Sequence, residues 1–367
     1  MVQTTATISD PIVRCANVTK RLRRSGPVAV ADISLEIPRR ALFGIFGPSG
    51  SGKSTLLRLA MGLLAPDSGT IIVNGVNVAQ NDPPVQVSAN YLPQTPDIPS
   101  ALTASELLYF TGTLRGMVSK EARSASGDLL DRAGLTAVAR RPLATVTQAQ
   151  QQLVRVCAAM MGYPHLLVLD DPMRDLDQTQ REWLWKLLRQ LHSETAMTTI
   201  IVTRDLAEAA RSVTHIAFLR QGQLSAVGTP ATLEEQFGVG PRMDMRLKPG
   251  TRLTEEMRRR LRTLGELAEH EQNALVLFPK PDVIGALAQP VTPAKVRLNS
   301  RKLAATPSTT TDMRADSWLL DRQVLPGSLG RTVEEIFTII GAERITEFWF
   351  SPPTLADVYQ RLEGVGI

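Results

Sequence analysis

The residues best able to do chemistry stand together in one glycine-rich stretch: Gly47, Pro48, Ser49, Gly50, Ser51, Gly52, Lys53, Ser54 and Thr55. A G-x-x-x-x-G-K-[ST] loop between a strand and a helix holds phosphates with its backbone N–H groups. The apolar residues 42–46 predict the strand, and residues 55–59 predict the start of the helix. We expect Lys53 to contact the β- and γ-phosphates of a nucleoside triphosphate and Ser54 to hold Mg²⁺. A chance Gly/Ser turn is the alternative, which this context disfavours.

An acidic pair closes the apolar run 166–169 and offers the carboxylate that phosphate-bound Mg²⁺ needs from a neighbouring strand. We expect Asp170, the first of the pair, to be this ligand. A plain helix cap is the alternative reading of the pair. The glycine-rich loop upstream favours the magnesium role.

Composition is that of an ordinary globular protein, and 367 residues suffice for one large domain and a smaller one. A net charge of +5 is too small an excess to indicate nucleic acid binding. Cys15 and Cys157 lack metal spacing, so we expect buried thiols in a reducing compartment. Residues 1–10 do not resemble a signal peptide, and no stretch approaches ~20 apolar residues. Any membrane role would therefore come through a partner.

Strands and helices alternate around the loop. Antiparallel strands are expected between residues 12 and 37, and further strands at 41–46, 70–73, 166–170, 198–202, 216–219 and 224–227. Helical spacing is found at 53–64, 102–143 and 180–191. The predicted fold class is α/β: a P-loop NTPase with a mainly parallel sheet, an antiparallel β subdomain and a helical subdomain.

The composition changes after residue 240, which we expect to divide a nucleotide-binding domain, 1–240, from a small C-terminal α+β domain, 241–367. A strand at 274–278, a helix at 332–340, a strand at 345–350 and a helix at 355–362 are expected there. Residues 299–316 are rich in Thr, Ser and Pro and are typical of a linker.

These pieces resemble the nucleotide-binding domain of ABC transporters from about Ile12 to Phe237. The loop, the lead-in 31–37, the stretch 66–75 and the closing stretch 222–230 all match that family. The resemblance implies ATP and Mg²⁺ as ligands. Gln94, in Tyr91-Leu92-Pro93-Gln94, matches the Q-loop, which reaches the metal and lies near the transporter contact. Asp177 closes the stretch that matches the D-loop.

The C-terminal stretch Pro353-Thr354-Leu355-Ala356-Asp357-Val358-Tyr359 resembles the P-T-L-E-D-V-F ending of drug- and polysaccharide-type exporter ATPase subunits. The two resemblances together imply a peripheral subunit on the cytoplasmic face of the membrane. It would act on a separate membrane subunit of an exporter.

Two departures from the family pattern concern hydrolysis. Asp171 stands where the family has its catalytic glutamate, so its carboxylate is one methylene shorter, and misplacing a general base by about an ångström can cost about 10²-fold. Arg204, after Thr203, replaces the switch histidine. A guanidinium can contact a γ-phosphate but cannot act as a neutral hydrogen-bond relay.

Two further departures concern the nucleotide's other contacts. The signature L-S-G-G-Q becomes Val146 followed by Thr147, Gln148, Ala149 and Gln150, so both glycines that permit close approach to a γ-phosphate across a dimer are gone. The aromatic residue that stacks on adenine falls at Leu22, so stacking is lost unless a neighbouring arginine replaces it.

We therefore expect an ATP-binding subunit with weak or no hydrolysis. Since both of its dimer faces are altered, it would pair with a different, better-preserved ATP-binding subunit, although a homodimer is the simpler alternative. Three other readings stay open: tolerated variants in a slow but working ATPase, a non-hydrolysing scaffold subunit, and a soluble ABC protein outside transport.

Overall fold

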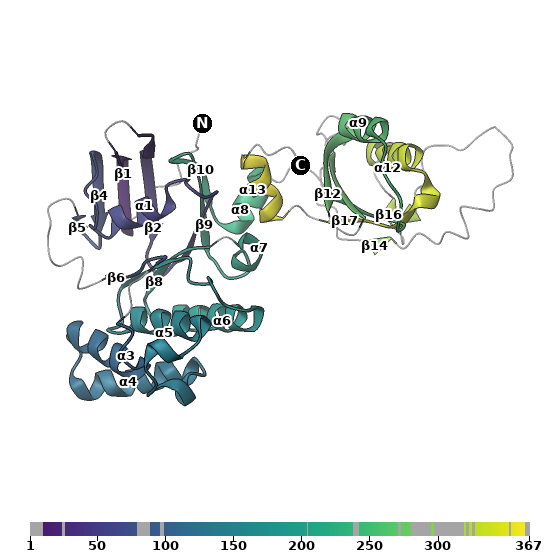
Figure 1. Cartoon of the computed structure of the whole chain (residues 1–367). Helices are drawn as coiled ribbons and strands as arrows, with labels where there is room; N and C mark the ends of the chain where they lie inside the picture. Colours follow the sequence, from purple (N-terminus) through teal and green to yellow (C-terminus); the bar gives the residue numbers. More distant parts are fainter. Residues whose placement is uncertain are drawn as a thin grey trace, which may run out of the picture. The chain divides into compact units, whose positions relative to one another are not determined.

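The computed structural model describes residues 10–23, 26–78, 89–95, 99–203, 205–237, 242–270, 273–279, 295–296, 319–320, 323–324, 327–351 and 354–363. The chain divides into two compact units, Met1–Pro230 and Ala231–Ile367 (Figure 1). The sequence-based boundary at residue 240 stays a prediction. The linker expected at 299–316 lies outside the described residues.

A six-stranded sheet forms the centre of the first unit, in the order β10-β9-β3-β8-β7-β6. Its strands are β3 (Leu42–Phe46), β6 (Ala89–Leu92), β7 (Leu166–Asp170), β8 (Thr198–Val202), β9 (His215–Arg220) and β10 (Gln223–Gly228). All neighbours are parallel except β9 and β10. Every residue of β3, β7 and β8 is buried, as expected for parallel strands covered on both faces. The predicted mainly parallel sheet is confirmed.

A second sheet of the first unit is antiparallel, in the order β2-β1-β4-β5. Its strands are β1 (Pro11–Arg21), β2 (Val28–Pro38), β4 (Ser68–Val73) and β5 (Val76–Asn77). One apolar core joins this sheet to β3 and to helix α1 (Lys53–Ala60), since Ile33, Phe43 and Leu57 belong to the same buried cluster. The glycine-rich loop is therefore held between two sheets that share a core.

Helix α1 is shorter than the sequence predicts. It ends at Ala60, not at Leu64. Gly62 takes a left-handed φ of 68°, and the N–H of Leu63 donates to the carbonyl of Arg58 at 2.9 Å. A left-handed glycine with this backward bond ends helices, and apolar spacing alone does not reveal it.

The remaining helices of the first unit are α3 (Ala104–Leu114), α4 (Ser119–Arg132), α5 (Gln148–Met160), α6 (Gln178–Glu194) and α7 (Leu206–Ala209), with 3₁₀ turns at Thr136–Val138 and Leu143–Thr145. Helix α3 packs against both α4 and α5 (Figure 1). The helical region expected at 102–143 and the helix at 180–191 are confirmed. Helix α5 was not predicted.

The second unit contains a five-stranded antiparallel sheet in the order β12-β13-β11-β17-β14. Its elements are α8 (Pro230–Phe237), β11 (Arg242–Leu247), α9 (Glu255–Leu264), β12 (Gly265–His270), β13 (Ala274–Pro279), β14 (Lys295–Val296), β15 (Leu319–Leu320), β16 (Gln323–Val324), α12 (Gly327–Ile340), a 3₁₀ turn at Ala342–Arg344, β17 (Ile345–Ser351) and α13 (Leu355–Glu363). Helices α9 and α12 share one apolar core with the sheet. The α+β character and the four expected elements are confirmed, whereas β11 and β12 were missed.

The exporter-like C-terminal motif has a clear structural task. Thr354 begins α13, and its backbone N–H donates to the Asp357 carboxylate at 2.7 Å. Asp357 also pairs with Arg242 of β11 at 3.2 Å, and Arg242 pairs with the buried Asp244 at 2.7 Å. The motif therefore fixes the last helix to the sheet of its own unit.

No helix in the described parts of the chain is long and apolar enough to cross a membrane. The two cysteines are buried and reduced, and burial raises the pKa of each thiol to about 12. Both thiols are therefore inert core groups, as predicted.

Candidate functional site

The glycine-rich loop connects the end of β3 to the start of α1, and three of its glycines adopt backbone conformations that side chains disfavour. Gly47, Gly50 and Gly52 have φ values of 153°, 80° and 100°. A Cβ on Gly52 would lie 2.1 Å from the carbonyl oxygen of Ala29, and one on Gly47 would lie 2.0 Å from that of Leu219. Only glycine fits at these two positions, because the neighbouring backbone cannot move away.

Lys53 folds back over this loop. Its Nζ donates to the carbonyl oxygens of Gly47 and Pro48, each at 2.7 Å, and lies 3.1 Å from Oγ of Ser51. These three partners are neutral, and they orient the ammonium group over the loop. A positive charge above a loop that precedes a helix N-terminus suits an anion such as a phosphate chain.

Two of the three residues expected to hold Mg²⁺, Ser54 and Asp170, are in contact. Asp170, at the end of β7, is only 2% exposed, and the Ser54 hydroxyl at the start of α1 is hydrogen-bonded to its carboxylate. Burial raises the pKa of Asp170 and the charge of Asp171 adds to this, while the bonds from Ser54 and Tyr91 act in the opposite direction. A carboxylate and a hydroxyl are oxygen ligands of the kind Mg²⁺ prefers, so the donor set fits this ion.

Tyr91 and Arg58 complete this cluster, and sequence reasoning missed their part in it. The Tyr91 hydroxyl donates to Oδ2 of Asp170 at 3.4 Å. Burial raises the pKa of Tyr91, as does the charge of Asp170, whereas a hydrogen bond with Arg58 of α1 lowers it. The Tyr91 ring therefore connects β6, β7 and α1 beneath the expected metal position.

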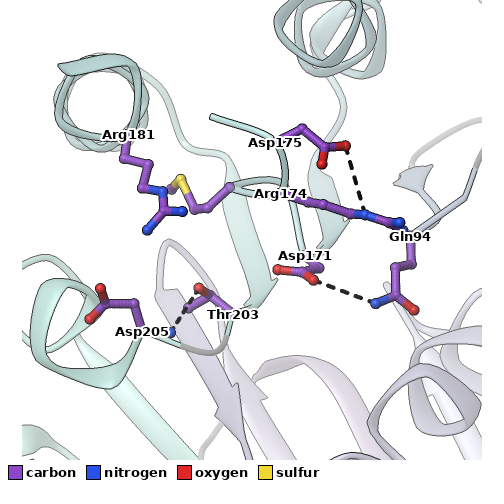
Figure 2. A pocket seen from close by; sticks show the side chains of 8 residues that line it. Gln94, Asp171, Arg174, Asp175, Arg181, Thr203 and Asp205 are labelled. Atoms are coloured by element: carbon purple, nitrogen blue, oxygen red, sulfur yellow. Dashed lines mark hydrogen bonds and ion pairs between the residues drawn. The ribbon is translucent and has the colours of Figure 1, made fainter. Parts of the chain in front are cut away.

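A cleft of about 420 Å³ opens beside Asp171. It is lined by Gln94, Asp171, Met173, Arg174, Asp175, Arg181, Thr203 and Asp205. The Gln94 amide donates to Oδ2 of Asp171 at 3.4 Å, and Figure 2 shows the two side chains pointing toward each other. The structure thus brings Gln94 and Asp171 together at one side of the cleft. Arg204 lies outside the described residues.

Two arginines line this cleft that the sequence did not single out. Arg174 extends along the side of the cleft where Gln94 lies and pairs with Asp175 at 3.7 Å (Figure 2). Arg181 donates from Nε to the carbonyl of Leu176 at 3.0 Å. The cleft therefore holds carboxylates and guanidinium groups side by side. It could accommodate an anion or a polarised water.

Asp177, expected at the nucleotide site, caps a helix. Its carboxylate accepts the backbone N–H of Gln180 at 2.8 Å, and the Gln180 side chain accepts the N–H of Asp177 at 3.0 Å. This reciprocal pair begins α6. Asp177 is exposed and does not line the cleft.

The residues at the signature position make a second capping pair. The hydroxyl of Thr147 accepts the N–H of Gln150 at 3.2 Å, and the side chain of Gln150 accepts the N–H of Thr147 at 3.1 Å. Gln148 and Ala149 are the first two residues of α5. None of the four lines the cleft beside Asp171.

Leu22, expected at the adenine position, is 58% exposed on the turn between β1 and β2. Two neighbouring cations have partners of their own. Lys20 pairs with Asp67, which precedes β4, at 2.8 Å, and the Arg21 guanidinium donates to the carbonyl of Gly26 in the turn. The structure therefore presents an exposed aliphatic side chain where the resemblance expects an aromatic ring.

Known proteins resemble the first unit of this chain. A linearmycin resistance ATP-binding protein of Bacillus subtilis is 31% identical over 57% of this chain and 67% of its own length. A daunorubicin/doxorubicin resistance ATP-binding protein of Streptomyces peucetius is 32% identical over 58% and 64%. A sulfate/thiosulfate import ATP-binding protein of Mycobacterium bovis is 35% identical over 59% and 60%. The match thus covers about 60 to 67% of these relatives.

Solved structures of nucleotide-binding domains also resemble this chain. The dimeric structure of a bacterial ABC transporter cassette matches 59% of this chain and 98% of that chain, with 25% identity and a TM-score of 0.55. The family model described as ABC transporter matches residues 30–174, which include the phosphate loop, the signature position and the acidic pair. This chain belongs to the ABC transporter family, as a nucleotide-binding domain.

Proposed function

We propose that this chain is an ATP-binding subunit of an ABC exporter that binds Mg-ATP and drives a separate membrane subunit, with weak or no hydrolysis of its own. One contrast carries the proposal: the phosphate loop with its Ser54–Asp170 pair is complete, whereas Asp171 in the adjoining cleft has a shorter side chain than the family's glutamate. Nucleotide binding depends on the loop and the Ser54–Asp170 pair, whereas hydrolysis depends on the carboxylate in the cleft.

The binding side has each part that a triphosphate requires. The loop amides and Lys53 would hold the β- and γ-phosphates, and Ser54, Asp170 and Gln94 would hold Mg²⁺. The metal, when bound, would neutralise part of the phosphate charge. Burial of Asp170 excludes water around its carboxylate, so its interactions with a cation would be strong.

The residues at the positions that support hydrolysis in the family are less suited to that task in this chain. Asp171 lies near Gln94, but a carboxylate one methylene shorter must move to polarise a water that a glutamate would reach directly. Thr147 and Gln150 are occupied in capping α5, and Gln148 and Ala149 place side chains where glycines would allow close approach. A dimer partner's phosphates would therefore be contacted less closely by this face.

This distribution of changes supports a heterodimer. In a homodimer, both nucleotide pockets would combine a shortened carboxylate with an altered signature. A better-preserved partner would repair one component of each pocket. We therefore propose a different ATP-binding chain as the partner, on the cytoplasmic face of the membrane.

Export is favoured by two observations. The C-terminal motif at 353–359 resembles exporter subunits. Two relatives are resistance proteins and another, from Sinorhizobium fredii, is a Nod factor export protein, although sulfate importers also match.

Calorimetric titration with Mg-ATP and a turnover assay on the purified full chain test the proposal. We expect saturable binding that Lys53→Ala weakens by about 10²-fold. We expect turnover about 10²-fold below that of a homodimeric cassette that keeps the glutamate, assayed in parallel. Turnover near that of the reference cassette would contradict the loss of hydrolysis. If no membrane protein co-purifies from solubilised membranes, the transporter assignment is wrong.

The scaffold alternative predicts a different result in cells. Asp171→Asn in this chain and the equivalent change in its partner can be compared by transport assay. If only the partner's change stops transport, this chain binds ATP to hold the assembly together and its own cleft is dispensable. Loss of transport in both variants supports a shared hydrolytic role.

A further inference from the structure

We infer that Arg174 recognises the terminal phosphate of the bound nucleotide, and that this contact makes the chain prefer ATP to ADP. The inference rests on the proposed binding of Mg-ATP and adds to it the residue that separates the two nucleotides. It depends on where the cleft beside Asp171 lies relative to the phosphate loop, and on which partners the Arg174 guanidinium has.

The order of the strands places the cleft on the far side of the expected metal position from the phosphate loop. The loop follows β3, and the sheet continues from β3 through β8 and β7 to β6, all parallel. Ser54 of the loop meets Asp170 at the end of β7. Thr203, Asp171 and Gln94 follow the ends of β8, β7 and β6, and all three line the cleft. A phosphate chain that begins at the loop and passes the metal therefore ends at the cleft.

The backbone after β7 fixes the point from which the Arg174 side chain extends. The N–H of Asp171 donates to the carbonyl of Val202, at the end of β8, at 2.8 Å. The N–H of Arg174 donates to the carbonyl of Asp171 at 3.2 Å, which closes a turn. Asp175 follows with a left-handed φ of 62°. The Arg174 side chain therefore leaves a turn that is anchored to the sheet, and it extends along the side of the cleft where Gln94 lies (Figure 2).

The guanidinium of Arg174 retains donors for an anion. Its carboxylate partner is Asp175, whose Oδ2 lies 3.7 Å from Nε, beyond hydrogen-bond length. Within the described ranges, the Arg174 side chain donates no hydrogen bond. A second arginine also faces Asp175: burial lowers the pKa of Arg155 in α5, the charge of Asp175 acts against this, and the charge of Arg174 adds to it. One carboxylate thus lies near two guanidinium groups, and its single charge does not neutralise both.

The other charged groups of the cleft have different partners or positions. Asp205 caps α7 with its side chain. Arg181 donates from Nε to a backbone carbonyl at 3.0 Å and lies toward Asp205 (Figure 2). Asp171 accepts from Gln94 at 3.4 Å, and Mg²⁺, when bound, would offset its charge. Among the described residues that line the cleft, Arg174 is therefore the cation available to a phosphate on the Gln94 side.

A guanidinium is well suited to a terminal phosphate. Its planar N–H donors match phosphate oxygens in pairs, and it stays charged at every physiological pH. ADP ends one phosphate earlier than ATP, so it would remain at the loop and Lys53 without reaching Arg174. A hydrogen bond between charged groups contributes about 10- to 100-fold in affinity. The Arg174 side chain is 45% exposed, so screening by solvent favours the lower value, about tenfold.

Calorimetric titration of the full chain with Mg-ATP and with Mg-ADP tests the inference. We expect Arg174→Ala to weaken ATP binding about tenfold and to leave ADP binding within about twofold. Arg174→Lys keeps the charge but loses the planar pair of donors, so it should weaken ATP binding only about threefold. The matched control is Arg344→Ala in the C-terminal unit, which should change neither affinity. Arg344 also pairs with its neighbour in sequence, Glu343, at 3.6 Å, and its side chain is 46% exposed.

Three results would overturn the inference and leave the proposed function standing. Equal weakening of ATP and ADP binding in Arg174→Ala would mean that the side chain supports the loop and does not contact the terminal phosphate. Unchanged ATP affinity in that variant would mean that the guanidinium makes no contact with the nucleotide. Equal affinity of the unaltered chain for ATP and ADP would mean that there is no preference to explain. If the unaltered chain shows no Lys53-dependent binding of Mg-ATP, the proposed function is wrong together with the inference.

Discussion

The phosphate loop and the cleft beside it adjoin each other, yet they are built on different principles. The loop depends on backbone conformation: Gly47 and Gly52 have no room for a side chain, and in loops of this kind the backbone N–H groups bind phosphate. The cleft depends on the length and direction of a few side chains, of which Asp171 and Gln94 are the central pair. A change in the first region would disrupt the chain path, whereas a change in the second leaves the fold intact.

This difference explains how one half of a site can change while the other persists. Asp171 and Asp175 both adopt left-handed φ values, 56° and 62°, which aspartate tolerates better than most residues. Arg174 and Asp175 pair with each other on the rim. The backbone of the loop after β7 therefore accommodates aspartate at both positions.

The largest expected effect is on the phosphate side. Lys53→Ala should weaken Mg-ATP binding by about 10²-fold, because charge-assisted hydrogen bonds to the phosphates are worth about 1.5–3 kcal/mol each. Isothermal titration calorimetry measures it. Lys120→Ala, at an exposed lysine of α4, is the matched control and should bind normally. Unchanged affinity in Lys53→Ala would show that the intact loop does not bind phosphate.

The parts of the phosphate side differ in how far the sequence predicts them. The loop with its flanking strand and helix follows from one local motif, because a strand–loop–helix unit fixes its own geometry. The meeting of Ser54 with Asp170 needed a second motif, the acidic pair that closes the apolar run 166–169. The contacts of Tyr91 with Arg58 and Asp170 join three elements far apart in sequence. Such contacts depend on sheet order and side-chain direction, which spacing does not reveal.

Several elements were missed for similar physical reasons. Helix α5 begins inside the altered signature, and its N-terminus is set by the reciprocal bonds between Thr147 and Gln150, which follow a capping pattern that the sequence contains. The strand β11 includes Arg242 and Asp244, charged residues that pair with each other and with Asp357 of α13 and Ser351 of β17. Long-range partners of this kind override the local preference of each residue.

The next largest effect is expected in the cleft. Asp171→Glu restores the missing methylene and should raise ATP turnover by about 10- to 100-fold, with little change in Mg-ATP affinity, because the general base would reach the attacking water. A phosphate-release assay on the chain with its partner, or on the chain alone, measures this. Such a gain in turnover would show that the length of the Asp171 side chain limits hydrolysis.

Two variants control this experiment. Asp205→Glu makes the same change elsewhere in the cleft, at the residue that caps α7, and should not raise turnover. Asp171→Asn should abolish whatever turnover the unaltered chain has. If Asp171→Glu is no faster than the unaltered chain, the short carboxylate is not what limits hydrolysis, and the contrast between the two regions has another cause.

A smaller effect is expected at the altered signature. The double change Gln148→Gly and Ala149→Gly should strengthen ATP-dependent association with a partner subunit by about 5- to 10-fold, because the backbone could approach the partner's γ-phosphate. It should also destabilise α5 by about 1–2 kcal/mol in total, since two glycines enter a helix. Analytical ultracentrifugation with and without Mg-ATP measures the first effect, and thermal unfolding the second.

Ala159→Gly, near the other end of α5, separates the two consequences. It should destabilise the helix by about 0.5–1 kcal/mol without changing ATP-dependent association. Association that rises equally in both variants would be a general result of a looser helix. The signature position would then have no special role.

The smallest effect is expected at Tyr91, whose hydroxyl contacts Asp170, the carboxylate expected to bind Mg²⁺. Tyr91→Phe removes a hydroxyl that donates to Asp170 at 3.4 Å, a long bond, so Mg-ATP affinity should fall by less than about threefold. Tyr109→Phe, whose hydroxyl lies 3.3 Å from that of Ser119 in the helical region, is matched in chemistry and distance and should leave binding unchanged. Titration over a range of Mg²⁺ concentrations compares them. A loss above tenfold in Tyr91→Phe would mean that phosphate binding also depends on a particular side-chain contact. The phosphate side would then be as vulnerable to single substitutions as the cleft, and backbone geometry alone would not account for its persistence.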